Sequence, residues 1–266
     1  MNDVFARRCE YQPEYEQSFH QHEQTQVTMI LSGGVEERVG QRRHWIGPLD
    51  LVVKPAGIVH ADRFGIRTTK TVQISFTLTP ETLPGSLAKR MTQWQTRQCT
   101  RTAPLFLQLL ASRRFRKRSS TTDLQAINRV LAGVGGEFAG SHAGARGPVR
   151  PDSDTDAHWA IDVDRWVRKH YCESVRVAEL ASHFGVHRVS LTRAFRQRFG
   201  TTIVDRVRRL RVQKAASLLA EGDGNVCQIA NDCGFADQSH LTRTFKVHTS
   251  LTPNTFRRLI RSPQAE

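Results

Sequence analysis

The chain has 266 residues, enough for two domains with cores of their own. Its 39 Lys and Arg residues against 25 Asp and Glu residues give a formal net charge of +14, which favours a polyanionic partner such as nucleic acid. With no signal peptide, no membrane-length apolar run and five scattered cysteines, we expect a reduced cytoplasmic protein and neither a membrane protein nor a disulfide scaffold.

The first part of the chain, from residue 18 to residue 78, consists of short β-rich runs broken by Gly and Pro turn signals. Several short strands at regular spacing predict a β-barrel or jelly roll, which we place in residues 1–79. The expected strands cover residues 26–31, 35–39, 50–54 and 72–78.

Three histidines of this β region have a spacing that suits a shared site. His20 and His22 are two positions apart, and on a strand such residues point to the same side, here into the barrel. His60 follows the turn sequence Pro55-Ala56-Gly57. Three imidazoles are able to hold zinc, iron or manganese and leave positions open.

This pattern resembles the two motifs of the cupins, HxH near the first strand and PxGxxH further along. In metal-binding cupins a carboxylate follows the HxH, whereas Gln26 occupies that place here and is a poorer ligand for a divalent ion. Three alternatives stay open: a divalent transition metal, a polar pocket of His20, His22, Gln26 and His60 that is either satisfied internally or contacts a small ligand, or mere surface histidines.

After residue 80 the apolar residues recur at helical spacing, which predicts helices over residues 102–115 and 122–138. We expect residues 80–140 to form a helical docking or dimerisation segment. Residues 141–157, rich in Gly, Ser, Pro and charge, predict a flexible linker.

The last hundred residues contain one pattern twice. The sequences LTRAF at 191–195 and LTRTF at 241–245 align, and upstream of each lies a short apolar helix pattern and a turn with adjacent Phe and Gly. This is the layout of a helix-turn-helix, whose second helix lies in the DNA major groove. We expect supporting helices at 177–184 and 226–233, and recognition helices at 187–199 and 237–248.

A long helix over residues 202–221 joins the two units. At about 1.5 Å per residue it spans roughly 30 Å, close to the ~34 Å of one turn of B-DNA. The spacing therefore predicts two recognition helices in successive major grooves of one duplex.

Helical spacing also predicts which side chains face outward. Arg pairs with guanine, Gln with adenine, and Val contacts a thymine methyl, while Lys246 suits a phosphate. The expected DNA-binding residues are Arg188, Val189, Thr192, Arg193 and Arg196 in the first unit, and Gln238, Ser239, Thr242, Arg243 and Lys246 in the second.

Residues 161–260 resemble the AraC/XylS family of bacterial transcription regulators. The second unit, IANDCGFADQSHLTRTFK, followed by Thr252-Pro253 and Phe256-Arg257, is similar to the family signature almost position by position. The chain departs from it at Ser250, where Gly is usual, and at Phe256, where Tyr is usual. The resemblance implies base reading by Val189, Thr192, Arg193, Gln238, Ser239 and Arg243.

Taken together, we expect an α+β two-domain protein with a cupin-like jelly roll first and an all-α tandem helix-turn-helix domain, residues 158–266, last. The expected function is ligand-controlled transcription regulation at a bipartite double-stranded promoter site, with a small-molecule effector and with RNA polymerase and a second copy of the chain as possible partners. The alternative is a metal-dependent cupin enzyme with an appended DNA-binding domain. The sequence contains no P-loop and no GxSxG motif, so we do not expect an enzyme.

Overall fold

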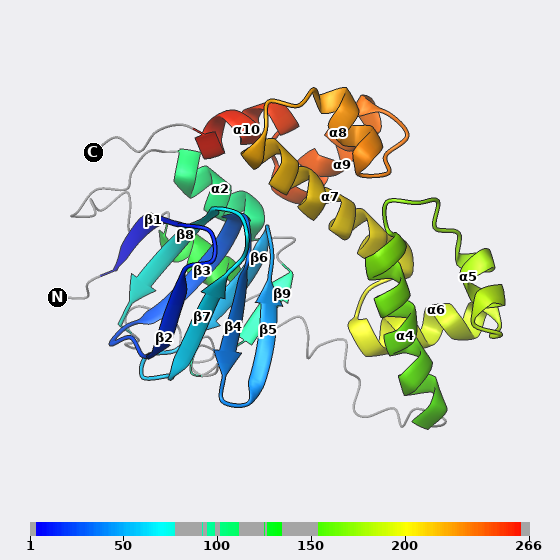
Figure 1. Cartoon of the computed structure of the whole chain (residues 1–266), viewed down its shortest axis with the longest axis horizontal. Helices are drawn as coiled ribbons and strands as arrows, with labels where there is room; N and C mark the ends of the chain where they lie inside the picture. The colour runs from blue at the N-terminus through cyan, green and yellow to red at the C-terminus, as the bar shows by residue number, and fades with distance from the viewer. Residues whose placement is uncertain are drawn as a thin grey trace.

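The computed structural model describes residues 4–77, 92, 95–98, 102–111, 125, 127–134 and 154–261. A β part comes first in the chain and a helical part comes last, and the long helix α7 runs from the neighbourhood of α8, α9 and α10 to that of α4 and α6 (Figure 1). This arrangement confirms the predicted α+β fold with a C-terminal helix-turn-helix region.

The β part consists of two antiparallel sheets, with strand order β1-β8-β3-β6-β9 in one and β2-β7-β4-β5 in the other. Side chains from both sheets, such as Ile30 and Phe64, pack together in one core between them. The strands are β1 (Phe5–Tyr11), β2 (Glu16–His20), β3 (Thr25–Ser32), β4 (Val35–Val39), β5 (Arg42–Ile46), β6 (Asp50–Lys54), β7 (His60–Phe64), β8 (Thr69–Phe76) and β9 (Gln95–Gln98).

Strand β3 lies at the centre of the larger sheet and is buried along its whole length. Its side chains alternate between two cores, as the pleat of a strand requires. Val27 and Met29 pack on the side of helix α2 (Ala103–Ala111), whereas Ile30 packs with Phe64 between the two sheets. The larger sheet is therefore covered on both faces, by the smaller sheet and by helices.

The four predicted strands correspond to β3, β4, β6 and β8. The structure adds strands with mixed or polar sequences, such as FARRCEY in β1 and RRHWI in β5, which lack a clear apolar alternation. Strand β9 also differs from expectation, because it lies in the segment expected to be helical and pairs with β6 at the sheet edge.

Two helical segments follow the β part. Helix α2 and the helical residues 127–134 both contribute to the larger core, through side chains such as Phe106 and Val130. The later end of the predicted helix 102–115 and both ends of the predicted helix 122–138 lie outside the described residues. Helix α4 begins at Asp154, so the last residues of the predicted linker 141–157 are helical and the rest lie outside the described residues.

Seven helices are described in the C-terminal part, and the five for which bounds were predicted agree with the prediction to within about two residues. The seven helices are α4 (Asp154–His170), α5 (Val177–His183), α6 (Arg188–Phe199), α7 (Ile203–Glu221), α8 (Val226–Asp232), α9 (Gln238–Thr249) and α10 (Pro253–Arg261). Within the described residues, no helix is both long and apolar enough to span a membrane.

The two helix-turn-helix units pack differently. The first unit has a core of its own, built around Val167, Leu191 and Phe195. The second unit shares a continuous core with the β part, because α2 contacts α9 and strand β3 contacts α7. Figure 1 shows the same arrangement, with α9 and α10 near α2 and with α5 and α6 at the far end of α7.

Candidate nucleic-acid interface and histidine cluster

Each recognition helix begins and ends at a residue that its sequence explains. Helix α6 is capped by His187, whose Nδ1 accepts a hydrogen bond from the Val189 backbone N–H at 3.3 Å. Helix α9 is capped by Asp237, whose Oδ1 accepts from the His240 backbone N–H at 2.7 Å. Side-chain acceptors at this position satisfy backbone donors that the first helical turn leaves unpaired, so both helices have fixed starting points.

The turn of the second unit depends on Gly234. Its φ of +78° is one that residues with a Cβ rarely adopt, and a Cβ there would lie 2.1 Å from the Cys172 carbonyl oxygen. The turn therefore packs directly against the end of α4, which brings the second unit close to the first.

The buried faces of the two recognition helices are equivalent. Leu191 and Phe195 of α6 are fully buried, as are Leu241 and Phe245 of α9. The residues predicted to face outward are all exposed, except for Thr242, which is half-buried. The structure therefore places both sets of candidate DNA-binding residues on accessible helix faces.

These faces are positively charged. Helix α6 has the sequence RVSLTRAFRQRF, with four Arg residues and no acidic residue. Thr192 differs from its neighbours because its hydroxyl donates to the Arg188 carbonyl oxygen at 2.9 Å. That hydroxyl is thus engaged within α6 itself.

Sequence reasoning missed one exposed apolar residue on the second recognition helix. Val247 follows Lys246 and is 78% exposed, more than Val189 of the first unit at 62%. Val247 lies four residues after Arg243, on the same side of the helix, and this spacing identifies it as another outward-facing residue.

Helix α7 connects the two units and is anchored at its first turn. The Thr202 hydroxyl accepts from the Asp205 backbone N–H at 3.1 Å and donates to the Asp205 carboxylate at 2.8 Å. Its 19 residues span about 28 Å at the usual helical rise.

A buried ion pair fixes α7 against α4. Arg206 donates to Asp164 at 2.8 Å, and Arg168 donates to the same carboxylate at 2.7 Å. Burial alone would raise the pKa of Asp164, but the hydrogen bonds from Arg206 and Arg168 outweigh burial and hold it below its usual value. The carboxylate is therefore ionised at neutral pH and holds both guanidinium groups.

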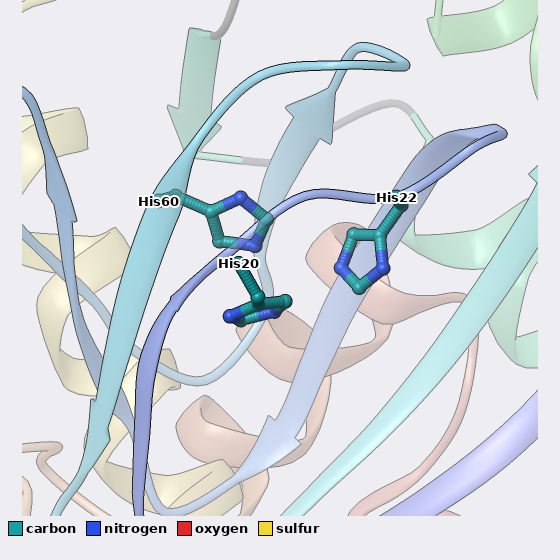
Figure 2. Close-up of side chains that lie close together, drawn as sticks. All are labelled: His20, His22 and His60. Carbon is teal, nitrogen blue, oxygen red and sulfur yellow. The ribbon is translucent and has the colours of Figure 1, made fainter.

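The three candidate histidines of the β part lie together (Figure 2). Their ring centroids are 4.4 Å apart for His20 and His60, 4.9 Å for His20 and His22, and 5.1 Å for His22 and His60. Strand β2 ends at His20, which is paired with His60 of β7, so His22 reaches the cluster from the connection that follows β2. Alternation along one strand, the expected reason for the cluster, therefore does not account for it.

A second group of buried polar residues adjoins the histidines. Lys54 Nζ lies 2.9 Å from Asp62 Oδ2 and 3.3 Å from Glu37 Oε2, and all three side chains are nearly inaccessible to solvent. Asp62 Oδ2 in turn lies 3.9 Å from His60 Nε2. Sequence reasoning missed this group because its members come from three strands, β6, β4 and β7.

The electrostatic environment keeps the imidazoles of His22 and His60 neutral. Burial is the largest cause that lowers the pKa of His22 to about 4, and the nearby His60 and Lys54 lower it further. Burial and Lys54 also lower the pKa of His60. Neutral imidazoles are able to accept hydrogen bonds or to bind a metal ion near pH 7.

Gln26 lies near the cluster without being part of it. It is buried on β3 and lines a small pocket between the sheets together with His22, Lys54 and Asp62. The pocket is lined both by polar residues such as Gln26 and Asp62 and by apolar residues such as Ile30. It suits a small ligand with both polar and apolar groups.

The C-terminal part of the chain is similar in sequence to known proteins. Residues 180–259 match the model of a helix-turn-helix domain family. An HTH-type transcriptional activator named RhaS from Escherichia fergusonii is 33% identical over 106 residues, which is 40% of this chain and 38% of that protein. A protein of the same name from Yersinia pestis is 31% identical over 114 residues, 43% of this chain and 41% of that protein. The chain thus spans less than half the length of these curated relatives.

Solved structures with similar arrangements include ToxT from Vibrio cholerae, which is 14% identical and covers 97% of this chain and 99% of that chain, with a TM-score of 0.38. The DNA-binding domain of AdpA, solved in complex with a target DNA, is 28% identical over 38% of this chain and 95% of that chain, with a TM-score of 0.37. At these TM-scores the assignment depends on the sequence matches. Residues 180–259 of this chain therefore form a helix-turn-helix region that is similar to that of HTH-type transcriptional activators.

Proposed function

We propose that this protein is a sequence-specific DNA-binding transcription regulator whose two helix-turn-helix units read one bipartite site. The observation that carries the proposal is the placement of two exposed, positively charged recognition helices at the two ends of α7. At about 28 Å, the span of α7 approaches the ~34 Å between successive major grooves on one side of a duplex.

Within this proposal the exposed residues have two kinds of role. We assign base reading to Val189, Thr192, Arg193, Gln238, Ser239 and Arg243, because their side-chain types match base edges in the major groove. We assign phosphate contacts to Arg188, Arg196, Thr242 and Lys246, since these groups bind the backbone irrespective of sequence. The exposed methyl groups of Val247 suit a contact with the sugar or with a thymine methyl at the edge of the groove.

A selection from a random duplex library with the purified full chain tests the proposal. The expected result is a motif of two half-sites about one helical turn apart. The variant Arg243→Ala should lose about 1–3 kcal/mol at one base position and relax the preference there. The variant Lys246→Ala should weaken binding to all sequences alike. It should also reduce the slope of the logarithm of the binding constant against the logarithm of the salt concentration by about 1.

The two variants serve as controls for each other, because they lie on the same helix, three residues apart. Recovery of no motif at all would contradict sequence-specific regulation. Identical effects of the two variants on all sequences would contradict the division into base-reading and phosphate-binding residues while leaving DNA binding itself intact.

We further propose that a small ligand bound in the N-terminal barrel changes the affinity for the promoter. Two observations support this: a pocket between the sheets lined by His22 and Gln26, and the core that the second unit shares with the barrel. Coupling between such sites is typically ~1–3 kcal/mol. Contact with RNA polymerase, formation of a homodimer and a cytoplasmic location complete the proposal, which includes no enzymatic activity.

The alternative of a metal-dependent enzyme receives no support from the curated relatives, which are named as transcriptional activators.

A further inference from the structure

Two cysteines lie where the two helix-turn-helix units meet, and both are free thiols. Cys172 follows the end of α4, a helix that packs in the core of the first unit through Val167. Cys233 ends α8 and belongs to the core that contains the second unit. A covalent bond between these two residues would therefore join the units directly, in addition to their connection through α7.

The backbones of the two cysteines come close together. A Cβ on Gly234 would lie 2.9 Å from the Cα of Cys172. A Cβ is ~1.5 Å from its own Cα, so the Cα atoms of Gly234 and Cys172 are within about 4.5 Å of each other. Cys233 precedes Gly234, and consecutive Cα atoms are ~3.8 Å apart, which sets an upper bound of about 8 Å for the Cα atoms of Cys172 and Cys233. The roughly 4.4–6.8 Å that disulfides span falls within this bound.

One face of α7 holds both cysteine-bearing segments. Lys214 Nζ donates to Cys172 Sγ at 3.2 Å and to the carbonyl oxygen of Asp232, the residue before Cys233, at 2.7 Å. Three residues earlier on the same helix, Arg211 Nε donates to the Tyr171 carbonyl oxygen at 2.7 Å. The end of α4 and the end of α8 are therefore fixed beside each other.

The two thiols differ in their access to a reagent. Cys172 is half-buried, whereas Cys233 is fully buried. Burial is the largest cause that raises the pKa of the Cys233 thiol to about 12; Lys214 acts in the opposite direction, and the nearby sulfur of Cys172 raises the pKa further. Oxidation of cysteine follows exposure and the thiolate form, so an oxidant in solution reacts with Cys172 first.

We propose that Cys172 and Cys233 form a disulfide when the protein meets hydrogen peroxide, and that this bond restrains the two helix-turn-helix units relative to each other. In the first step the Cys172 thiolate attacks a peroxide oxygen, the O–O bond breaks, hydroxide leaves, and Cys172 becomes a sulfenic acid. In the second step the Cys233 sulfur attacks the Cys172 sulfur, the S–O bond breaks, and the Cys233 proton leaves with the hydroxyl group as water. The hydroxide takes up the proton that Cys172 had lost, so two thiols are oxidised to one disulfide and one peroxide is reduced to two waters.

The test uses the tag-free full chain, oxidised with hydrogen peroxide, alkylated to block the remaining thiols, digested, and analysed by mass spectrometry without reductant. We expect two peptides linked through Cys172 and Cys233, which dithiothreitol returns to two free thiols. The control is Cys227→Ser, because Cys227 is exposed on the same helix α8 and takes no part in the bond. This variant should form the same link.

Two further variants separate the two steps. Cys172→Ser should leave Cys233 reduced, since the buried thiol then has no oxidised partner. Cys233→Ala should stop Cys172 at the sulfenic acid, which dimedone labels. Circular dichroism establishes that both variants fold. The restraint itself is measured on the unmodified protein, whose melting temperature should rise by several degrees when the bond is present, because the bond limits the conformations of the unfolded chain.

Several results would overturn the proposal. One is a reduced pair of Cys172 and Cys233 at a peroxide concentration that oxidises the exposed Cys227. Another is a bond from Cys172 to any cysteine other than Cys233, including one in a second copy of the chain. An unchanged melting temperature in the bonded chain would overturn the restraint. None of these measurements includes DNA, so the failure of this proposal and the failure of the proposed DNA-binding function are distinguishable.

Discussion

At the residue scale, the barrel interior is organised around Lys54. Its ammonium group contacts the carboxylates of Glu37 and Asp62, which are register partners on neighbouring strands β4 and β7. Charges that are taken out of water remain stable only when they are paired and hydrogen-bonded. One cation thus makes it possible for two carboxylates to lie between the sheets.

Replacing Lys54 should therefore be costly. Lys54→Met retains most of the side-chain volume but leaves two buried carboxylates without a cation, and we expect a loss of about 3–5 kcal/mol in the free energy of unfolding. Urea denaturation measures it. The control is Lys70→Met, which removes a solvent-accessible pair with Glu10 and should cost at most about 1 kcal/mol. Similar small losses in both variants would show that Lys54 has no special role.

The sequence predicted part of this interior. His20, His22 and His60 pointed to a shared site because the two motifs that contain them, HxH and PxGxxH, are each local in the sequence. The group of Lys54, Glu37 and Asp62 remained hidden because it forms only when strands pair in one register, and register is decided by contacts that are distant in the sequence.

At the scale of single elements, the same contrast separates helices from strands. The helices of the two helix-turn-helix units and the long helix between them were predicted almost to the residue, since apolar spacing and capping residues such as Thr202 and Asp237 are local signals. Strands β1, β2, β5, β7 and β9 were not predicted. Their pairing partners compensate for weak patterns, as in β1, whose charged sequence pairs along its length with β8.

The end of α9 shows how one element tolerates a departure from the family pattern. Ser250 caps the helix with a φ of +58°, the left-handed conformation that Gly200 adopts with a φ of +66° at the end of α6. The Ser250 backbone N–H still donates to the Lys246 carbonyl oxygen at 2.8 Å. The turn therefore keeps its form and carries the strain of a side chain in this conformation.

Exchanging the two capping residues should change stability in opposite directions. Ser250→Gly should raise the free energy of unfolding by about 1 kcal/mol, because glycine adopts the left-handed conformation without strain. Gly200→Ser should lower it by a similar amount, since there is open space around Gly200 and only the backbone conformation is penalised. Thermal denaturation of the full chain measures both. A change of the same sign in both variants would refute the explanation.

At the scale of the whole molecule, the β part and the C-terminal part meet at Asp50. Its carboxylate accepts from Gln213 of α7 at 2.8 Å and from the Gly47 backbone N–H at 3.0 Å. Burial is the main cause that raises the pKa of Asp50 to about 7, although both hydrogen bonds and the charges of Arg206 and Arg168 act in the opposite direction.

A raised pKa means that the folded state binds the Asp50 proton more tightly than the unfolded state does. The contribution of Asp50 to stability is therefore largest in acid and declines as the pH rises from about 4 to about 7. Asp50→Asn loses one acceptor and should melt below the unmodified protein at pH 5, but the difference should shrink by several degrees at pH 8. Melting curves over this range measure it, with the exposed Asp162→Asn as the control. A difference that is constant with pH would rule out titration of Asp50.

The unequal packing of the two helix-turn-helix units has a mechanical consequence. The second unit and the barrel share one core, whereas the first unit has a separate core and is attached to the rest through α7 and α4. Any bending of α7 therefore displaces the first unit, while the second unit keeps its position against the barrel. Under the proposed function, movement of the first unit would accommodate half-sites of uneven separation, and a ligand bound in the barrel would act on the second unit first.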